Sequence, residues 1–146
     1  MLVQGPDGKM RRLFAAASLS VLAGMMEANG ESSDHIWEQT EVWHVSEPVL
    51  DRWLDLAAEG LAGAILSAAT LLELDTVLID GWMPAWVRAR VVAATQEAFL
   101  RQDLSGIAPP TLREGTLGPQ ARSLGAAAIP LSQRYLIDQN VAAREA

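Results

Sequence analysis

The chain has 146 residues, 50% hydrophobic and 20% charged, which is typical of one folded domain or part of one and excludes a disordered chain. Eleven lysines and arginines against eighteen aspartates and glutamates give a formal charge of −7, which argues against nucleic-acid binding because phosphate contacts need clustered cations. The absence of cysteine excludes disulfides and a cysteine nucleophile, and two histidines make a multi-histidine metal site improbable.

The first part of the chain predicts a turn followed by a buried helix. Residues 5–8, Gly-Pro-Asp-Gly, have turn chemistry, and the apolar run from Leu13 to Ala28 predicts a helix that ends at Asn29-Gly30. Because Lys9, Arg11 and Arg12 precede this run, a signal peptide is the alternative, although the residues after the run form a poor cleavage site. We therefore favour the buried helix.

Residues 31–71 predict a short helix and then a long central one. Ser33 or Asp34 is a candidate N-cap for the short helix, which we expect to run through Trp43, and Ser46 is the expected N-cap of the long helix. Apolar residues recur in the long helix at steps of four and three, which indicates one buried stripe; a free-standing coiled coil is the alternative. The stripe comprises Leu50, Leu54, Ala57, Leu61, Ala64, Ala68 and Leu71.

No apolar stretch is long enough to cross a membrane. The most apolar helix is uncharged only between Glu59 and Glu73, which is shorter than the ~20 residues a spanning helix needs. Another face of this helix carries Asp51, Asp55 and Glu59 at spacings of four. A carboxylate site for metal or acid–base work is conceivable there, but a solvated acidic face is the simpler interpretation.

The second half of the chain predicts alternating strands and helices. Residues 76–79 predict a buried strand, residues 85–101 a helix with Arg88 on its outer side, and residues 111–116 a second strand. Gly118-Pro119 opens a last helix with Pro130 inside it, and its predicted inward stripe comprises Ala121, Leu124, Ala128, Leu131 and Tyr135. Strand–helix–strand order predicts a parallel pair, hence an α/β fold that is predominantly helical with a short parallel sheet.

Few residues suggest chemistry. The sequence has no Gly-x-Ser-x-Gly, His-Glu-x-x-His or Walker-type motif, and His35 and His44 stand near tryptophans, which favours packed or surface histidines over catalytic ones. The strand–turn–helix around Gly81 is the one feature with the shape of a ligand site, because a glycine there admits a ligand to the backbone and the helix start offers free N–H groups. A plain connecting turn is the simpler interpretation.

Several segments resemble one family. Residues 118–127, Gly-Pro-Gln-Ala-Arg-Ser-Leu-Gly-Ala-Ala, resemble the closing Gly-x-x-Ala-x-x-x-Gly-Ala-Ala segment of the ROK family of sugar-responsive repressors and sugar kinases. Residues 74–81 resemble its strand and nucleotide turn, and the Trp-Leu and Ala-Ala pairs at 53–54 and 57–58 resemble its preceding helix. Leu13 with Ala17-Ser18 resembles the start of the helix after the family's sugar-binding and zinc region. The resemblance covers nearly the whole chain.

The resemblance implies that residues 1–146 form the carboxy-terminal lobe of an actin-like, ribonuclease H-like ATPase domain. The family's amino-terminal lobe, with its first phosphate loop and catalytic aspartate, its sugar-binding segment and any DNA-binding domain would lie outside this chain. The family's zinc cysteines would fall near residues 3–12, where the sequence has none, so we expect a zinc-free branch without a metal site. An internal helix at 13–26 also weakens the signal-peptide alternative.

The nucleotide turn departs from the family pattern. By the resemblance Gly81 is the cofactor-binding residue, but Asp80 stands where the pattern has its first glycine, and Trp82 follows. The added charge and bulk put ATP binding in doubt, so we expect no cofactor and favour the regulator branch over the kinase branch.

We therefore predict a cytoplasmic, non-catalytic lobe of a sugar-responsive transcriptional regulator with a scaffold and oligomerisation role. It would bind sugar only together with the other lobe, and it would have no membrane or nucleic-acid partner of its own. Because a two-stranded sheet is rarely stable alone, we expect a homo-oligomer, formed through the stripe of the long helix or the strand at 76–79. The alternatives are a lobe of an ATP-dependent sugar kinase of the glucokinase or N-acetylhexosamine kinase type, with ATP as cofactor, and a free-standing helical interaction module.

Overall fold

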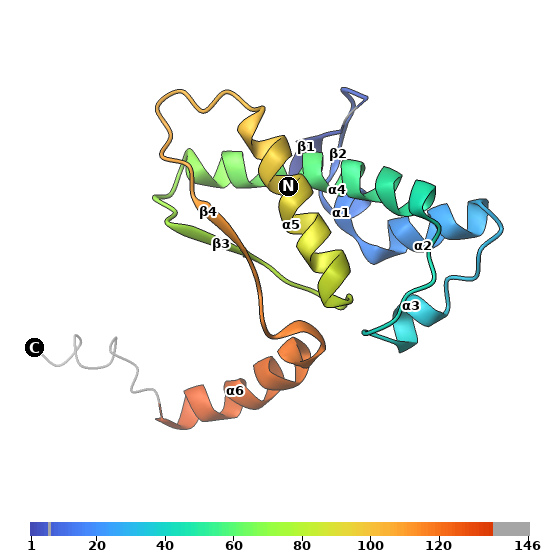
Figure 1. The fold of residues 1–146 in the computed structure, drawn as a ribbon. Coiled ribbons are helices and arrows are strands. Elements are labelled where there is room, and N and C mark those ends of the chain that lie inside the picture. Colours follow the sequence, from blue (N-terminus) through green and yellow to red (C-terminus); the bar gives the residue numbers. More distant parts are fainter. Residues whose placement is uncertain (6, 136–146) are drawn as a thin grey trace, which may run out of the picture.

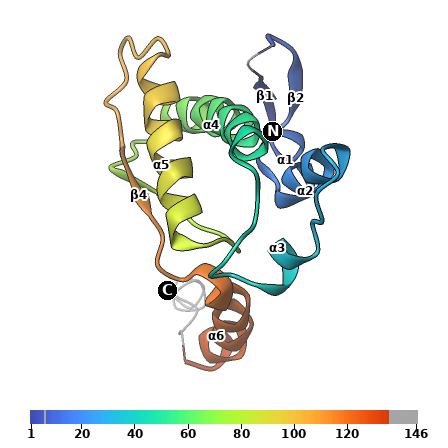
Figure 2. The same ribbon diagram turned by 45° about the vertical axis from the view of Figure 1, so that its right-hand side comes forward.

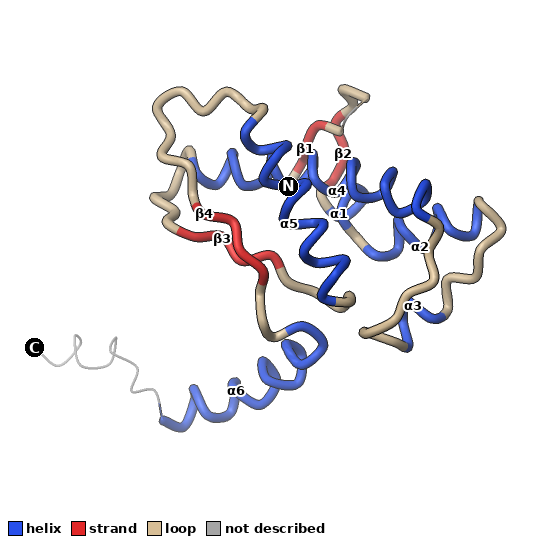
Figure 3. Tube along the Cα trace, viewed as in Figure 1, coloured by secondary structure: helices blue, strands red, loops and turns tan. Residues whose placement is uncertain are grey.

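The computed structural model describes residues 1–5 and 7–135 and has a mixed architecture of helices and two small sheets (Figure 1). Helices dominate, and the strands are short (Figure 3). The predicted α/β character and the short parallel sheet are confirmed at this level. The elements in chain order are β1 (Leu2–Gln4), β2 (Met10–Arg12), α1 (Phe14–Ala17), α2 (Leu19–Ala28), α3 (His35–Glu38), α4 (Glu47–Ala69), β3 (Thr76–Ile79), α5 (Ala85–Leu100), β4 (Thr111–Glu114), the 3-10 turn η1 (Gly118–Gln120) and α6 (Ala121–Tyr135).

A β-hairpin at the start of the chain was not predicted. Strands β1 and β2 pair antiparallel, and the turn between them lies where Gly-Pro-Asp-Gly predicted one. The Gly5 N–H donates to the Lys9 carbonyl over 3.0 Å, and Gly8 has a φ of 74°, which glycine adopts without steric cost. Each strand has only three residues, too few for an alternating pattern to be recognised. Val3, 3% exposed, anchors the hairpin.

The predicted helix at 13–28 is interrupted at Ser18. This residue has extended backbone angles, φ −84° and ψ 153°, and separates α1 from α2. Its carbonyl accepts a hydrogen bond from Trp53 Nε1 at 3.1 Å, so a buried indole of α4 satisfies an acceptor that the break releases. The predicted end at Asn29-Gly30 is confirmed, with Gly30 at φ 79°.

The segment before α4 is less helical than predicted. Helix α3 covers only residues 35–38, and Gln39 is already extended, so the predicted helix through Trp43 is wrong. Ser46 does occupy the N-cap position of α4, but its hydroxyl bonds to Glu31 Oε1 over 2.5 Å instead of capping a helix N–H. The Ser33 hydroxyl likewise donates to Glu27 Oε1 over 2.8 Å. The Ser46 bond holds the start of α4 to the loop after α2, and the Ser33 bond holds that loop to the last turn of α2.

Helix α4 is the centre of the molecule. The hairpin, α1 and α2 pack on one side of it and α5 on the other (Figure 2), so it is no free-standing coiled coil. At Gly60 an added Cβ would lie 3.0 Å from Ala16 Cβ, so a glycine is what allows α1 to approach this closely. The predicted stripe is buried at Leu50, Leu54 and Ala57, but α4 ends at Ala69, which leaves Leu71 beyond the helix and 84% exposed.

The parallel pairing of the two later strands is confirmed. The register runs from Thr76 opposite Thr111 to Ile79 opposite Glu114, and α5 connects the strands and packs on the sheet (Figure 1). The predicted buried strand is buried on one face only: Ile79 is 8% exposed and Leu78 65% exposed. The opposite face of this sheet is open.

Helix α6 leaves the body of the molecule. Among the described residues its main contact is η1, and both views show it projecting below the other elements (Figures 1 and 2). Its predicted inward stripe is therefore wrong within this chain: Ala121, Leu124 and Ala128 are exposed. The side chains of Leu131 and Tyr135, predicted for the same stripe, lie outside the described part of the structure.

None of the helices in the described part of the chain is both long and apolar enough to span a membrane.

Candidate functional site

The predicted strand–turn–helix is present. Strand β3 ends at Ile79, Asp80 and Gly81 form the turn, and Pro84 is the residue before the first turn of α5. The turn lies at the carboxyl end of β3, which is where parallel sheets place their ligand sites. The local geometry therefore matches the shape that the sequence predicted.

The N–H groups of this region are directed at the Asp80 carboxylate. The Gly81 N–H donates to Asp80 Oδ1 at 2.8 Å, and the Leu117 N–H donates to Oδ2 at 3.0 Å. The Gly118 N–H approaches both oxygens, at 3.1 and 2.9 Å. One carboxylate thus connects the end of β3 to the start of η1 and α6.

Arg88 completes this cluster from the first turns of α5. Its Nη1 lies 3.6 Å from Asp80 Oδ1 and its Nε 3.4 Å from Glu114 Oε2 at the end of β4. The Arg88 side chain is only 15% exposed, so the prediction that it lies on the outer face of its helix is wrong. Helix periodicity could not show this, because the carboxylates that draw it inward come from two strand ends.

The cluster stabilises the ionised form of Asp80. Partial removal from water raises the pKa of Asp80, but the N–H groups of Gly118, Gly81 and Leu117 and the charge of Arg88 together outweigh this effect. The pKa of Asp80 therefore lies below its ordinary value of 3.8. Asp80 is an anion at neutral pH and poorly suited to act as a general base.

The glycines around the cluster have different roles. At Gly115 an added Cβ would lie 2.4 Å from Asp80 Cβ, so no side chain fits there. Gly118 has a φ of 50°, in the left-handed region, which turns its N–H toward the carboxylate. At Gly81 an added Cβ would meet only the terminal methyl of Met83, at 3.0 Å. The sequence analysis selected Gly81, whereas Gly115 is the position at which the structure leaves no room for a side chain.

The N–H groups at this turn can bind an anion, and the anion that they bind is the Asp80 carboxylate of the same chain. The backbone donors that a phosphate would use at the end of β3 and the start of η1 already bond to Asp80. Gly81 is at the predicted place, but its N–H is engaged. The arrangement is that of a structural junction between β3, β4 and α6.

The acidic residues of α4 form ion pairs with α5. Asp51 lies 2.6 Å from Arg90 and Glu59 lies 2.6 Å from Arg101, while Asp55 between them is exposed. In the part of the chain that the structure describes, no group of three or more histidines, aspartates and glutamates could hold a metal ion. The carboxylates of α4 serve to join the two helices.

The two histidines lie close together. Their ring centroids are 5.9 Å apart, and the backbone N–H of His44 donates to His35 Nε2 at 3.1 Å. His44 is exposed and His35 partly buried. The bond positions the loop after α3, in line with the surface or packing role that the sequence favoured.

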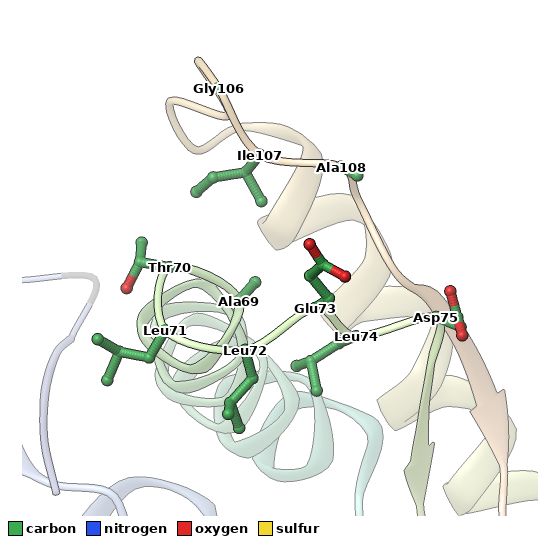
Figure 4. Close-up of a pocket in the computed structure, with 10 residues that line it drawn as sticks. All are labelled: Ala69, Thr70, Leu71, Leu72, Glu73, Leu74, Asp75, Gly106, Ile107 and Ala108. Carbon is green, nitrogen blue, oxygen red and sulfur yellow. The ribbon is translucent and has the colours of Figure 1, made fainter.

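Among the hollows outside this junction, two are lined by several large apolar side chains. One, of about 460 Å³, lies where α4 ends, between residues 69–75 and 106–108 (Figure 4). Figure 4 shows Leu71 and Leu72 pointing away from Ile107, so its apolar side chains do not converge. The other, of about 490 Å³, was not predicted, because its lining comes from three separate segments. Its residues are Phe14, Ser18, Leu19, Ser20, Trp37 and Trp82, here called the aromatic hollow.

The sequence matches no protein-family model and no curated protein.

Proposed function

We propose that this chain is the non-catalytic carboxy-terminal lobe of a ROK-type, sugar-responsive transcriptional regulator with an actin-like domain. In that role it acts in the cytoplasm as a scaffold and in self-association, and it contributes to sugar binding only together with an amino-terminal lobe. The support is the order of the resembling segments along the chain, combined with the parallel strand–helix–strand unit, in which the segment at 74–81 lies.

The observation that carries the non-catalytic part is the bonding of Asp80. A nucleotide phosphate at the end of β3 would need the N–H groups of Gly81 and Gly118, which bond to this carboxylate at 2.8 and 2.9 Å. A bound phosphate would also face a negative charge held in place by Arg88. The sugar-kinase alternative requires this turn to bind ATP, and the Asp80 carboxylate in the turn disfavours ATP binding.

An enzymatic assay tests the first part of the proposal. Phosphoryl transfer needs a metal, phosphate-binding groups and a positioned base, which the kinases of this family draw from two lobes. We expect the chain to show no ATP-dependent phosphorylation of glucose, N-acetylglucosamine or N-acetylmannosamine. Turnover above a blank without protein would refute the proposal and favour the kinase lobe.

Calorimetry with Mg-ATP tests the turn directly. We expect no detectable binding at millimolar ATP, which corresponds to an affinity weaker than ~4 kcal/mol. Replacing Asp80 by Gly frees the backbone donors, and Trp82→Gly removes bulk and restores the family pattern, so the double variant is the form expected to gain affinity. Asp55→Gly is the matched control for loss of one carboxylate. Micromolar binding to the unmodified chain would overturn the regulator assignment.

The DNA sequence upstream of the Met1 codon separates the two branches. An encoded winged helix-turn-helix segment supports the regulator, and a phosphate loop with an intact catalytic aspartate supports the kinase. A preceding region that encodes neither segment supports the free-standing interaction module.

A further inference from the structure

An asparagine followed by a glycine stands at the carboxyl end of α2. Asn29 is the C-cap residue of this helix, and Gly30 after it has a φ of 79°. The backbone nitrogen that follows an asparagine can attack the side-chain amide carbon, and a glycine has no side chain to hinder this attack. Both residues are exposed, so water reaches them. The other asparagine of the sequence, Asn140, precedes Val141, a β-branched residue that hinders the same attack.

The reaction at this pair would consume one water and release one ammonia. The Gly30 nitrogen loses its proton and bonds to Asn29 Cγ, the Cγ–Nδ2 bond breaks, and Nδ2 leaves as ammonia with that proton. Water then opens the five-membered imide at either of its two carbonyls. One opening gives aspartate, and the other gives isoaspartate, in which the main chain runs through the side-chain carbon. The only co-reactant is water.

The closed C-cap of α2 engages both reacting groups. The Gly30 N–H donates to the Glu27 carbonyl at 3.0 Å, and Asn29 Nδ2 donates to Glu31 Oε1 at 2.6 Å. Ring closure therefore needs a local opening in which these two bonds break. The end of a surface helix opens at small cost in free energy while the rest of the fold stays intact. We expect the reaction to be slower in the folded chain than in the unfolded chain, but to proceed in both.

Glu31 connects the end of α2 to the start of α4. Its Oε1 accepts a hydrogen bond from the Ser46 hydroxyl at 2.5 Å, and its Oε2 accepts one from the Ser46 N–H at 3.1 Å. These two donors, followed by the Asn29 amide, hold the pKa of Glu31 below its ordinary value of 4.5. Since Ser46 is the N-cap residue of α4, one carboxylate joins the two ends of the segment that contains α3 (Figure 1).

An acid at position 29 would oppose this connection. A carboxylate cannot donate to Glu31 Oε1, and its negative charge would stand beside that of Glu31. It would also stand at the C-terminus of α2, where the helix dipole disfavours a negative charge. Isoaspartate would in addition lengthen the main chain within the cap. Each of these changes weakens the hold of Glu31 on the start of α4.

We propose that Asn29 is a site of spontaneous deamidation, and that its conversion to an acid weakens the connection from α2 through Glu31 to α4. The inference goes beyond the proposed function and uses nothing of the family resemblance. Copies of this chain then differ in stability according to their age.

Timed incubation of the full chain at mildly alkaline pH tests the reaction. Trypsin releases residues 13–52 as one peptide, which contains Asn29 and no other asparagine. We expect this peptide to gain the mass difference between an amide and an acid, with fragment ions that place the gain at residue 29 and with release of an equal amount of ammonia. Asn29→Gln is the matched control and should show no gain over the same period, because its longer side chain would have to close a larger ring.

The same incubation in urea removes the protection of the fold. We expect Asn29 to convert faster in urea than in the folded chain, and faster there than Asn140. A folded chain whose residue 29 stays an amide while the chain in urea converts would overturn the proposal. Conversion of Asn140 ahead of Asn29 in urea would also overturn it.

The variant Asn29→Asp tests the structural consequence directly. We expect the midpoint of its thermal unfolding to fall by about 2–4 °C and the Ser46 amide to exchange hydrogen faster. Gln39→Glu is the matched control, because it adds the same charge at the exposed C-cap of α3 and removes no hydrogen bond to Glu31. Its midpoint should fall less, and its Ser46 exchange should stay unchanged. An Asn29→Asp variant that matches the unmodified chain in both measurements would overturn the proposal.

A second background separates the role of Glu31 from that of the helix dipole. In a chain with Glu31→Gln, residue 31 has no charge to repel an acid at position 29, so Asn29→Asp should lower the midpoint less than it does in the unmodified chain. Equal shifts in the two backgrounds would overturn the role given to Glu31. Circular dichroism checks that each variant keeps the fold.

Discussion

Replacing Asp80 by Ala tests the junction between β3, β4 and α6. The substitution removes the acceptor for the N–H groups of Leu117 and Gly118, which lie far along the chain from Asp80. Hydrogen bonds to a charged acceptor contribute about 1.5–3 kcal/mol each, and we take the low end because the Asp80 side chain is 22% exposed. Two such bonds predict a loss of about 3 kcal/mol in the free energy of unfolding.

Urea unfolding followed by circular dichroism measures this loss, with Asp55→Ala as the control. Asp55 is exposed, and its side chain makes no hydrogen bond or ion pair in the described structure, so its replacement should change stability by less than about 0.5 kcal/mol. Equal effects of the two substitutions would refute the role given to Asp80.

The Asp80→Ala variant also tests how the stability contributed by Asp80 depends on pH. Because the pKa of folded Asp80 is lowered, its contribution to stability is complete above the ordinary value of 3.8 and is lost as pH falls through the lowered folded-state pKa. The difference in stability between the unmodified chain and Asp80→Ala should therefore be constant near neutral pH and shrink in acid. A difference that grows as pH falls from 5 would contradict the lowered pKa.

Four further substitutions give distinct expected results in urea unfolding. Gly115→Ala should cost more than about 2 kcal/mol, because its Cβ would lie 2.4 Å from Asp80 Cβ, whereas Gly63→Ala, with nothing within 4 Å, should gain up to about 1 kcal/mol from helix propensity. Thr95→Val should stabilise by about 1 kcal/mol, because Thr95 is 0% exposed and its hydroxyl has no hydrogen-bond partner among the described residues. A loss above about 1 kcal/mol would contradict this and reveal a bond made by the hydroxyl. Arg90→Ala should cost less than about 1 kcal/mol, and less still in high salt, because its two ion pairs to α4 are solvent-exposed.

Local signals in the sequence were sufficient for several elements. Strand β3 is a run of four β-branched and apolar residues, a proline precedes α5, and a glycine follows α2. Each of these signals lies within or next to its element, and the structure confirms all three elements. The parallel pairing of β3 with β4 also followed, because a strand–helix–strand order leaves few alternatives.

Features that depend on distant partners could not be predicted from local pattern. Ser18 interrupts a continuous apolar run, and its released carbonyl is satisfied by Trp53 from another helix. Arg88 occupies an outward helical position by period but turns toward Asp80 and Glu114. The predicted strand–turn–helix is present, but no local pattern could show that Leu117 and Gly118 direct their N–H groups at Asp80.

The distance in sequence between β3 and β4 affects folding while the chain is being synthesised. When the ribosome has released Thr76–Ile79, its pairing partner has not been synthesised, since all of α5 lies between the two strands. At about 5–20 residues per second, β3 waits several seconds with unpaired edges while the helical part can already pack. Its exposed Leu78 makes this nascent chain prone to aggregation during that interval, so chaperone supply and translation speed between Asp80 and Thr111 should govern the yield of folded protein.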